Sequence, residues 1–211
     1  NGSSPPPPPP LHTRRGAPRA AREPAPSGRR RRKRRRAAMV AVSPLEKKID
    51  PMKCMGNWYV QVAIPTPFDR GATNGLEQYE WDQQKQRVMV KYTFNSGSFE
   101  GKAREVKQVG RVHPASGSGT AWQVAPWLGC CYLPFWLDYI IIDIDDKDYS
   151  YMVCSSPSTG GVAPWMYIMT RQKVVEDDYL KPMQATAVKA GWDAAKMERM
   201  PQQPPAAAEA A

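Results

Sequence analysis

Few side chains in this 211-residue chain have the chemistry that catalysis needs. Its two histidines are His12, in a segment rich in Pro and Arg, and His113, beside Pro114 in a predicted turn. A Ser-His-Asp arrangement would have to use His113, and residues 155–161 lack the lysine that a phosphate-binding loop requires. We therefore expect no catalytic residue, and a function other than that of an enzyme.

Four cysteines remain as candidate nucleophiles or metal ligands. Their spacing matches no zinc finger or ribbon, and four are too few for a disulfide scaffold in a chain of this size. Buried free thiols are the simplest interpretation, while a Cys54–Cys154 bridge, or one that uses Cys130 or Cys131, stays open. As an enzymatic alternative, Cys154 or Cys130 could be a nucleophile, but neither has a basic neighbour in sequence that would lower its thiol pKa.

Acidic residues gather at Asp143, Asp145, Asp146 and Asp148. An EF-hand calcium loop that began at Asp143 would need glycine where Asp148 stands and glutamate where Cys154 stands. A tight turn between two strands explains these acids better. We therefore expect neither a metal site nor a cofactor.

Residues 1–38 carry most of the excess positive charge. They hold 12 of the 30 Lys and Arg residues and one of the 20 acids, which leaves 18 basic and 19 acidic residues, a net charge of −1, in the rest. With so few apolar residues the segment cannot offset its ordering entropy, so we predict disorder. It could be a leader upstream of a start at Met39, an organelle transit segment, a nuclear or nucleic-acid tether, or a contact with anionic lipid. Only this basic tail favours nucleic acid as a partner.

From Ser43 onward the pattern is that of a folded domain. Eight short runs alternate apolar and polar residues, which predicts an all-β fold: an eight-stranded up-and-down antiparallel β-barrel. A capping pattern at residues 43–46 predicts a short N-terminal helical turn, and an apolar stripe before Gly191 predicts one C-terminal α-helix. We assign the barrel domain to 43–200 and a disordered tail to 201–211. The expected strands are Trp58 to Ile64, Leu76 to Trp81, Arg87 to Phe94, Ser98 to Val109, Gly119 to Val124, Leu137 to Ile144, Tyr149 to Cys154 and Ala163 to Arg171.

The first expected strand opens with Gly56-Asn57-Trp58-Tyr59, and the last closes with Thr170-Arg171. If the two strands lie side by side, Arg171 can stack on Trp58, a cation–π contact that contributes about 0.5–2 kcal/mol. Gly56 and Trp58 near the start, Asp138-Tyr139 in the middle and Thr170-Arg171 at the end resemble the three signature regions of the lipocalins. Pro65 to Phe68, Met166 to Arg171 and Gly191 to Asp193 resemble the branch that includes apolipoprotein D, bacterial lipocalins and plant temperature-induced lipocalins.

This resemblance implies a barrel that encloses a fatty acid, lysophospholipid, isoprenoid or pigment, a helix packed outside, and a role in membrane or stress protection. Because side chains alternate along a strand, inward-pointing Trp58 and Arg171 place every second neighbour in the cavity, unless those positions are ordinary core. The predicted cavity residues are Val60, Val62, Tyr79, Trp81, Val90, Tyr92, Trp122, Val124, Tyr139, Ile141, Tyr167 and Met169.

Residues 125–136 contain almost no polar side chain. They either fold over the core or form an apolar lip that touches a membrane or a partner. No run of about 18 apolar residues and no signal-peptide core is present, so we expect an intracellular protein, peripheral to a membrane at most. The alternative to a lipid carrier is a structural subunit with a filled barrel, docked on a membrane protein assembly. The predicted contact residues are Phe68, Trp127, Leu128, Tyr132, Leu133, Phe135 and Trp136.

Overall fold

The computed structural model describes residues 2–4, 42–157 and 161–204. The chain divides into two units, residues 1–37 and 38–211, and the second contains the barrel. The predicted disorder of residues 1–38 concerns residues that lie almost entirely outside the described ranges, as do residues 205–211 of the tail.

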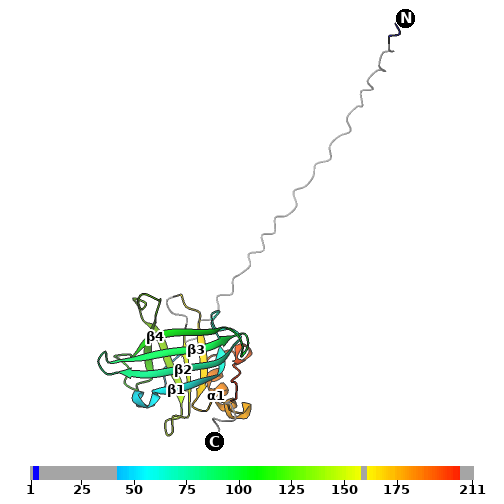
Figure 1. The fold of residues 1–211 in the computed structure, drawn as a ribbon. Coiled ribbons are helices and arrows are strands. Elements are labelled where there is room, and N and C mark those ends of the chain that lie inside the picture. The colour runs from blue at the N-terminus through cyan, green and yellow to red at the C-terminus, as the bar shows by residue number, and fades with distance from the viewer. Residues whose placement is uncertain (1, 5–41, 158–160, 205–211) are drawn as a thin grey trace, which may run out of the picture. The chain divides into compact units, whose positions relative to one another are not determined.

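Eight antiparallel strands form a closed up-and-down barrel, as predicted. Each strand pairs with the next along the chain, and β1 pairs with both β2 and β8, which closes the sheet. Figure 1 shows β1 to β4 side by side across one wall of the barrel, with α1 against its outside. The strands are β1 (Gly56–Ile64), β2 (Ala72–Asp82), β3 (Arg87–Ser96), β4 (Ala103–Val112), β5 (Ala121–Pro126), β6 (Leu137–Ile144), β7 (Tyr151–Ser156) and β8 (Trp165–Thr170).

The short helix before β1 begins later than predicted. It is a 3-10 helix, η1 (Pro51–Cys54), whose N-cap is Asp50: the Asp50 carboxylate accepts a hydrogen bond from the backbone nitrogen of Met52, and Pro51 opens the helix. The prediction placed this turn at Ser43 to Glu46. That segment instead lies along the barrel wall, where the backbone nitrogen of Leu45 donates to the oxygen of Ile141 at 3.0 Å.

A β-bulge in β1 reverses which of its side chains face the barrel interior. Val60 pairs with Met169 and Val62 with Ile168, so Gln61 is the extra residue. Its fully buried side chain donates a hydrogen bond to the Thr170 hydroxyl at 2.9 Å. As a result Val60 and Ala63 face the barrel core, whereas Val62 and Ile64 face outward.

Two apolar cores follow from this arrangement. One fills the barrel, and the other lies between the outer side of the sheet and the C-terminal helix α1 (Asp177–Lys189). Leu180, Met183 and Ala187 share one face of α1 and bury it against β6 and β8. The predicted outer helix is therefore present.

The chain after α1 returns to the barrel. A short 3-10 helix, η2 (Ala194–Lys196), leads to β9 (Glu198–Arg199), which pairs with β1. Residues 201–204, predicted as part of a disordered tail, are docked instead, because Gln202 Nε2 donates to the backbone oxygens of Val60 and Gly75 at 2.7 and 3.0 Å. Within the described residues, every helix is too short or too polar to span a bilayer.

Candidate ligand-binding site

Trp58 and Arg171 fasten the end of the barrel where β1 begins and β8 ends. The guanidinium carbon lies 3.6 Å from the centroid of the fully buried Trp58 ring, so the predicted stacking is present. The Trp58 indole nitrogen donates to the backbone oxygen of Cys54 at 2.8 Å, which attaches η1 to the same contact. The Arg171 guanidinium also donates to the backbone oxygens of Lys53, Asn57 and Tyr149, at 2.9, 2.8 and 3.2 Å.

The other predicted signature residues support this closed end or lie on β6. Gly56 has φ of 98°, and a Cβ there would lie 3.3 Å from a guanidinium nitrogen of Arg171, so both conformation and space favour glycine. Thr170 is buried and accepts the hydrogen bond from Gln61. Tyr139 points into the barrel core, and Asp138 pairs with Gln123 of β5.

A cavity of about 240 Å³ opens at the other end of the barrel, beneath the loop that joins β1 to β2. Five of the twelve predicted cavity residues line it: Val90, Tyr92, Val124, Tyr139 and Tyr167. Its walls are mainly apolar and aromatic, which is typical of small-molecule sites. The further lining residues are Thr66, Phe68, Asp69, Glu77, Val106, Gln108, Pro126, Leu133, Leu137, Val162 and Trp165.

The remaining predicted cavity residues belong to packed structure. Trp122 fills the barrel between Tyr79 and Tyr139, with ring centroids 6.1 and 6.0 Å away. Val62 is a wrong prediction, because the bulge at Gln61 turns it into the outer core under α1. The rest lie in the barrel core without lining this cavity: Val60, Tyr79, Ile141 and Met169 are buried there, and Trp81 is partly buried at its edge.

Two buried carboxyl groups line the cavity, and the sequence analysis missed both. Asp69 is 1% exposed and accepts hydrogen bonds from the hydroxyls of Tyr167 at 2.5 Å and Tyr92 at 3.4 Å. Thr66 donates to the same carboxylate through its backbone nitrogen and its hydroxyl, at 2.9 and 2.6 Å. Asp69 therefore anchors the first loop to the barrel interior.

Glu77 is 3% exposed and accepts a hydrogen bond from Tyr79, whose oxygen lies 2.5 Å from that of Tyr139. Burial raises the pKa of the Glu77 carboxyl to about 7, with the charge of Asp69 acting in the same direction. Its position could have been predicted, because Glu77 alternates with Tyr79 and Trp81. Asp69 lies in a loop, where no periodic pattern reveals its orientation.

The predicted contact residues separate into two groups. Phe68, Trp127, Leu128 and Phe135 are exposed at the mouth, at 57%, 38%, 58% and 44%, and we call these four residues the lip. The others are half-buried: Leu133 lines the cavity, the Tyr132 ring lies 4.9 Å from that of Trp127, and Trp136 lies under the guanidinium of Arg111 at 4.2 Å.

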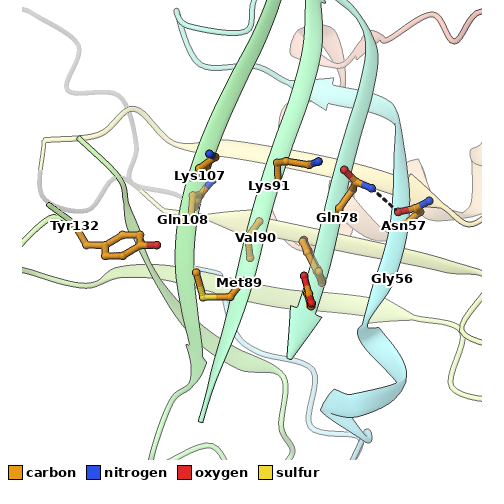
Figure 2. Close-up of a pocket in the computed structure, with 11 residues that line it drawn as sticks. Gly56, Asn57, Gln78, Met89, Val90, Lys91, Lys107, Gln108 and Tyr132 are labelled. Atoms are coloured by element: carbon orange, nitrogen blue, oxygen red, sulfur yellow. Dashed lines mark hydrogen bonds between the residues drawn. The ribbon is translucent and has the colours of Figure 1, made fainter. Parts of the chain in front are cut away.

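A second hollow, of about 370 Å³, lies across β1 to β4 beside Tyr132 (Figure 2). Gln78 donates to the side-chain oxygen of Asn57 there, at 3.1 Å. Lys91 and Lys107 are opposite each other on β3 and β4, at positions that alternate with the inward-pointing residues of these strands. With Glu80 as its one acidic lining residue among those described, this hollow has a net positive charge, whereas the charged residues that line the cavity are acidic.

All four cysteines carry free thiols. Burial raises the pKa of Cys54 to about 12 and also raises the pKa of Cys154, so both thiols stay protonated at neutral pH. Cys130 and Cys131 are exposed, with sulfurs 3.5 Å apart. Asp145, from the acidic run, accepts from the backbone nitrogen and hydroxyl of Ser150, which supports the turn interpretation.

Together these features define a class: an up-and-down antiparallel barrel, fastened at one end by a Trp–Arg contact and open at the other into an apolar cavity. The profile of the family described as "Lipocalin-like domain" matches residues 49–202, and the chain belongs to the lipocalin family. Outer membrane lipoprotein Blc of Vibrio cholerae serotype O1 is 22% identical over 149 residues, which are 71% of this chain and 80% of Blc.

Solved structures show the same fold at low sequence identity. Insecticyanin from the tobacco hornworm Manduca sexta matches with a TM-score of 0.61 and 15% identity, over 77% of this chain and 85% of that one. Lobster apocrustacyanin A1 matches with a TM-score of 0.54 and 16% identity, over 80% and 94% of the two chains.

Proposed function

We propose that this lipocalin binds a small hydrophobic ligand in the cavity at the barrel mouth and carries it without altering it chemically. The observation that supports the proposal is the cavity itself: an apolar, aromatic-walled space of about 240 Å³ inside the barrel. Binding is favoured over catalysis because, of the two candidate nucleophiles, the buried Cys154 has a raised thiol pKa and is a poor nucleophile, and the exposed Cys130 is not among the residues that line the cavity.

The cavity volume limits how much of the ligand is enclosed. It is slightly smaller than typical small-molecule sites of roughly 300–1,000 Å³, so one end of a lipid enters and the rest extends across the lip. Burial of about 300 Å² of apolar surface gains at most about 7 kcal/mol, which corresponds to a dissociation constant of about 10 μM. A fatty acid, lysophospholipid, isoprenoid or pigment fits this description.

Titration with a neutral fluorescent probe, N-phenyl-1-naphthylamine, tests the proposal. Val106 lines the cavity from β4, and Val106→Trp should fill it and abolish probe binding. Val109→Trp is the matched control, because Val109 lies on the same strand at the opposite parity and is absent from the cavity wall. Equal probe binding by the two variants, or none by the natural protein, would contradict the carrier function.

A second candidate function is that of a structural subunit held at a membrane or a membrane protein assembly. The exposed lip favours it, since contiguous exposed apolar residues usually mark contact sites. The relative from Vibrio cholerae is named an outer membrane lipoprotein, and a peripheral membrane role for the present chain agrees with that name. This function predicts that the probe does not bind and that Val106→Trp leaves membrane association unchanged.

A further inference from the structure

The charge inside the cavity is of one sign. Asp69 and Glu77 are the charged residues among those that line it, and no lysine, arginine or histidine does so within the described part of the chain. Basic residues line the hollows outside the cavity instead: Lys91 and Lys107 line the outer one, and Lys107, together with Glu105, lines a hollow that adjoins the lip. A ligand with an anionic end would therefore meet two carboxyl groups inside the barrel and no compensating cation.

The two carboxyl groups are not equivalent. Asp69 accepts four hydrogen bonds, from Thr66, Tyr92 and Tyr167, so protein donors already occupy its oxygens. The hydrogen bond from Tyr79 to one oxygen of Glu77 is the one that this carboxyl makes among the described residues. The second Glu77 oxygen is thus open to a ligand, although the side chain is almost fully buried and lines the cavity.

Tyr79 and Tyr139 form a chain of hydrogen bonds that ends at Glu77. Because Tyr79 donates its one hydroxyl hydrogen to Glu77, the short contact with Tyr139 must be a donation from Tyr139 to the Tyr79 oxygen. Tyr79 is therefore the donor to Glu77, and Tyr139 donates to Tyr79. The second Glu77 oxygen can accept a hydrogen bond from a ligand when the carboxyl is ionised, and the carboxyl can donate one when it is protonated. A hydroxyl or carbonyl group can use one or both forms.

We infer that the cavity selects ligands whose enclosed end is uncharged and bears a hydroxyl or carbonyl group, as in long-chain or isoprenoid alcohols, and discriminates against fatty-acid carboxylates through Glu77. This inference rests on the proposed carrier function. The carboxylate of a fatty acid, buried beside Glu77, would lose its hydration without gaining a cationic partner. Discrimination against such a ligand is therefore strong. A fatty acid that entered tail first would leave the free Glu77 oxygen against a methyl group, which is also unfavourable.

Competition with the naphthylamine probe tests the inference with two ligands of equal chain length, decanol and decanoate, near pH 8. We expect the dissociation constant of decanol, obtained from its displacement of the probe, to be at least about tenfold lower than that of decanoate. Glu77→Gln, which keeps the shape and removes the charge, should reduce this ratio to about threefold or less. Glu80→Gln, three residues further along β2 on its exposed side, should leave the ratio unchanged.

Equal affinity of the natural protein for decanol and decanoate, or an unchanged ratio in Glu77→Gln, would overturn the inference while leaving the carrier function intact. Failure of the probe to bind at all would instead remove the carrier function. The two failures are therefore distinguishable.

If Glu77→Gln does not fold, decyl sulfate, an anion at every pH used, replaces the variant. Its affinity should rise by about tenfold between about pH 8 and pH 5.5 as Glu77 becomes protonated. The phenols and thiol that face Glu77 stay neutral in this range, because burial raises their pKa values, and Asp69 is the remaining acid. A flat profile would contradict the role of Glu77. The neutral groups are Tyr79, Tyr92, Tyr139, Cys154 and Tyr167.

Discussion

The two ends of the barrel are built in opposite ways. At the closed end Trp58 is fully buried, and the Arg171 guanidinium stacks on it and donates to three backbone oxygens. At the mouth Phe68 and Leu128 are more than half exposed, and deeper in the cavity, beside Trp58 on the neighbouring strand, Glu77 keeps one oxygen available. The closed end contains two of the three signature regions, with Gly56, Trp58 and Arg171, whereas the residues that would choose a ligand lie in the cavity and at its mouth. Family membership therefore establishes the barrel without establishing its ligand.

The largest loss of stability should come from Trp58→Ala, at the closed end. Loss of a large buried side chain typically costs about 3–5 kcal/mol, and here it also removes the ring under Arg171 and the donor to the Cys54 oxygen. Trp127→Ala, at the exposed lip, is the matched control and should cost less than about 1 kcal/mol. Urea denaturation measures both. Similar losses in the free energy of unfolding for the two variants would show that the closed end contributes no more to stability than the mouth does.

The next effect is the pH dependence of stability that the buried acid in the cavity, Glu77, should cause. Because the Glu77 pKa is about 7 in the folded protein and 4.5 in the reference state, the folded state binds more protons between these values. Its contribution to the free energy of unfolding is complete below about pH 4.5 and falls by about 3 kcal/mol as pH rises to 7.

Glu77→Gln should remove that loss. Urea denaturation of both proteins across this range gives the difference between their stabilities, in which contributions of other groups, such as the raised pKa of Asp143, cancel. A difference independent of pH would show that Glu77 titrates normally.

The closed end could be predicted well from the sequence, because the strands and the residues that form it show regular alternation and short local motifs. Eight alternating runs required a barrel, and Gly56, Trp58 and Arg171 stand at the two strands that close it. Val62 was placed wrongly because residues 60–62 alternate without interruption. The bulge depends on the Gln61 amide, which donates a hydrogen bond to Thr170 on the neighbouring strand β8, 109 residues later in the chain.

The mouth was harder to predict for a different reason. Its lip was visible as an apolar stretch, but Leu133 and Trp136 turn toward the cavity and toward Arg111, because an irregular loop has no period that fixes side-chain direction. Asp69 owes its burial to three donors from residues 66, 92 and 167, which only the closed barrel brings together.

The smallest effect on stability, with the clearest effect on surface contact, should come from the lip. Replacing Phe68 and Leu128 by serine should lower the free energy of unfolding by about 1 kcal/mol or less, because both side chains are mostly exposed and the main loss is the edge contact of Phe68 with Phe94. If the lip inserts into a bilayer, loss of roughly 60 Å² of apolar contact weakens membrane binding by about 1.5 kcal/mol, or about tenfold.

Sedimentation with neutral phosphatidylcholine vesicles measures this effect and excludes attraction of residues 1–38 to anionic lipid. Val188→Ser is the control, since Val188 is 44% exposed on α1, away from the mouth. Equal sedimentation of the lip variant and the control would exclude the lip as a membrane contact. Tenfold weaker binding of the lip variant alone to the vesicles would show that the lip contacts the bilayer. The end of the barrel that contributes less to stability would then hold the cavity against the membrane, from which a ligand would enter.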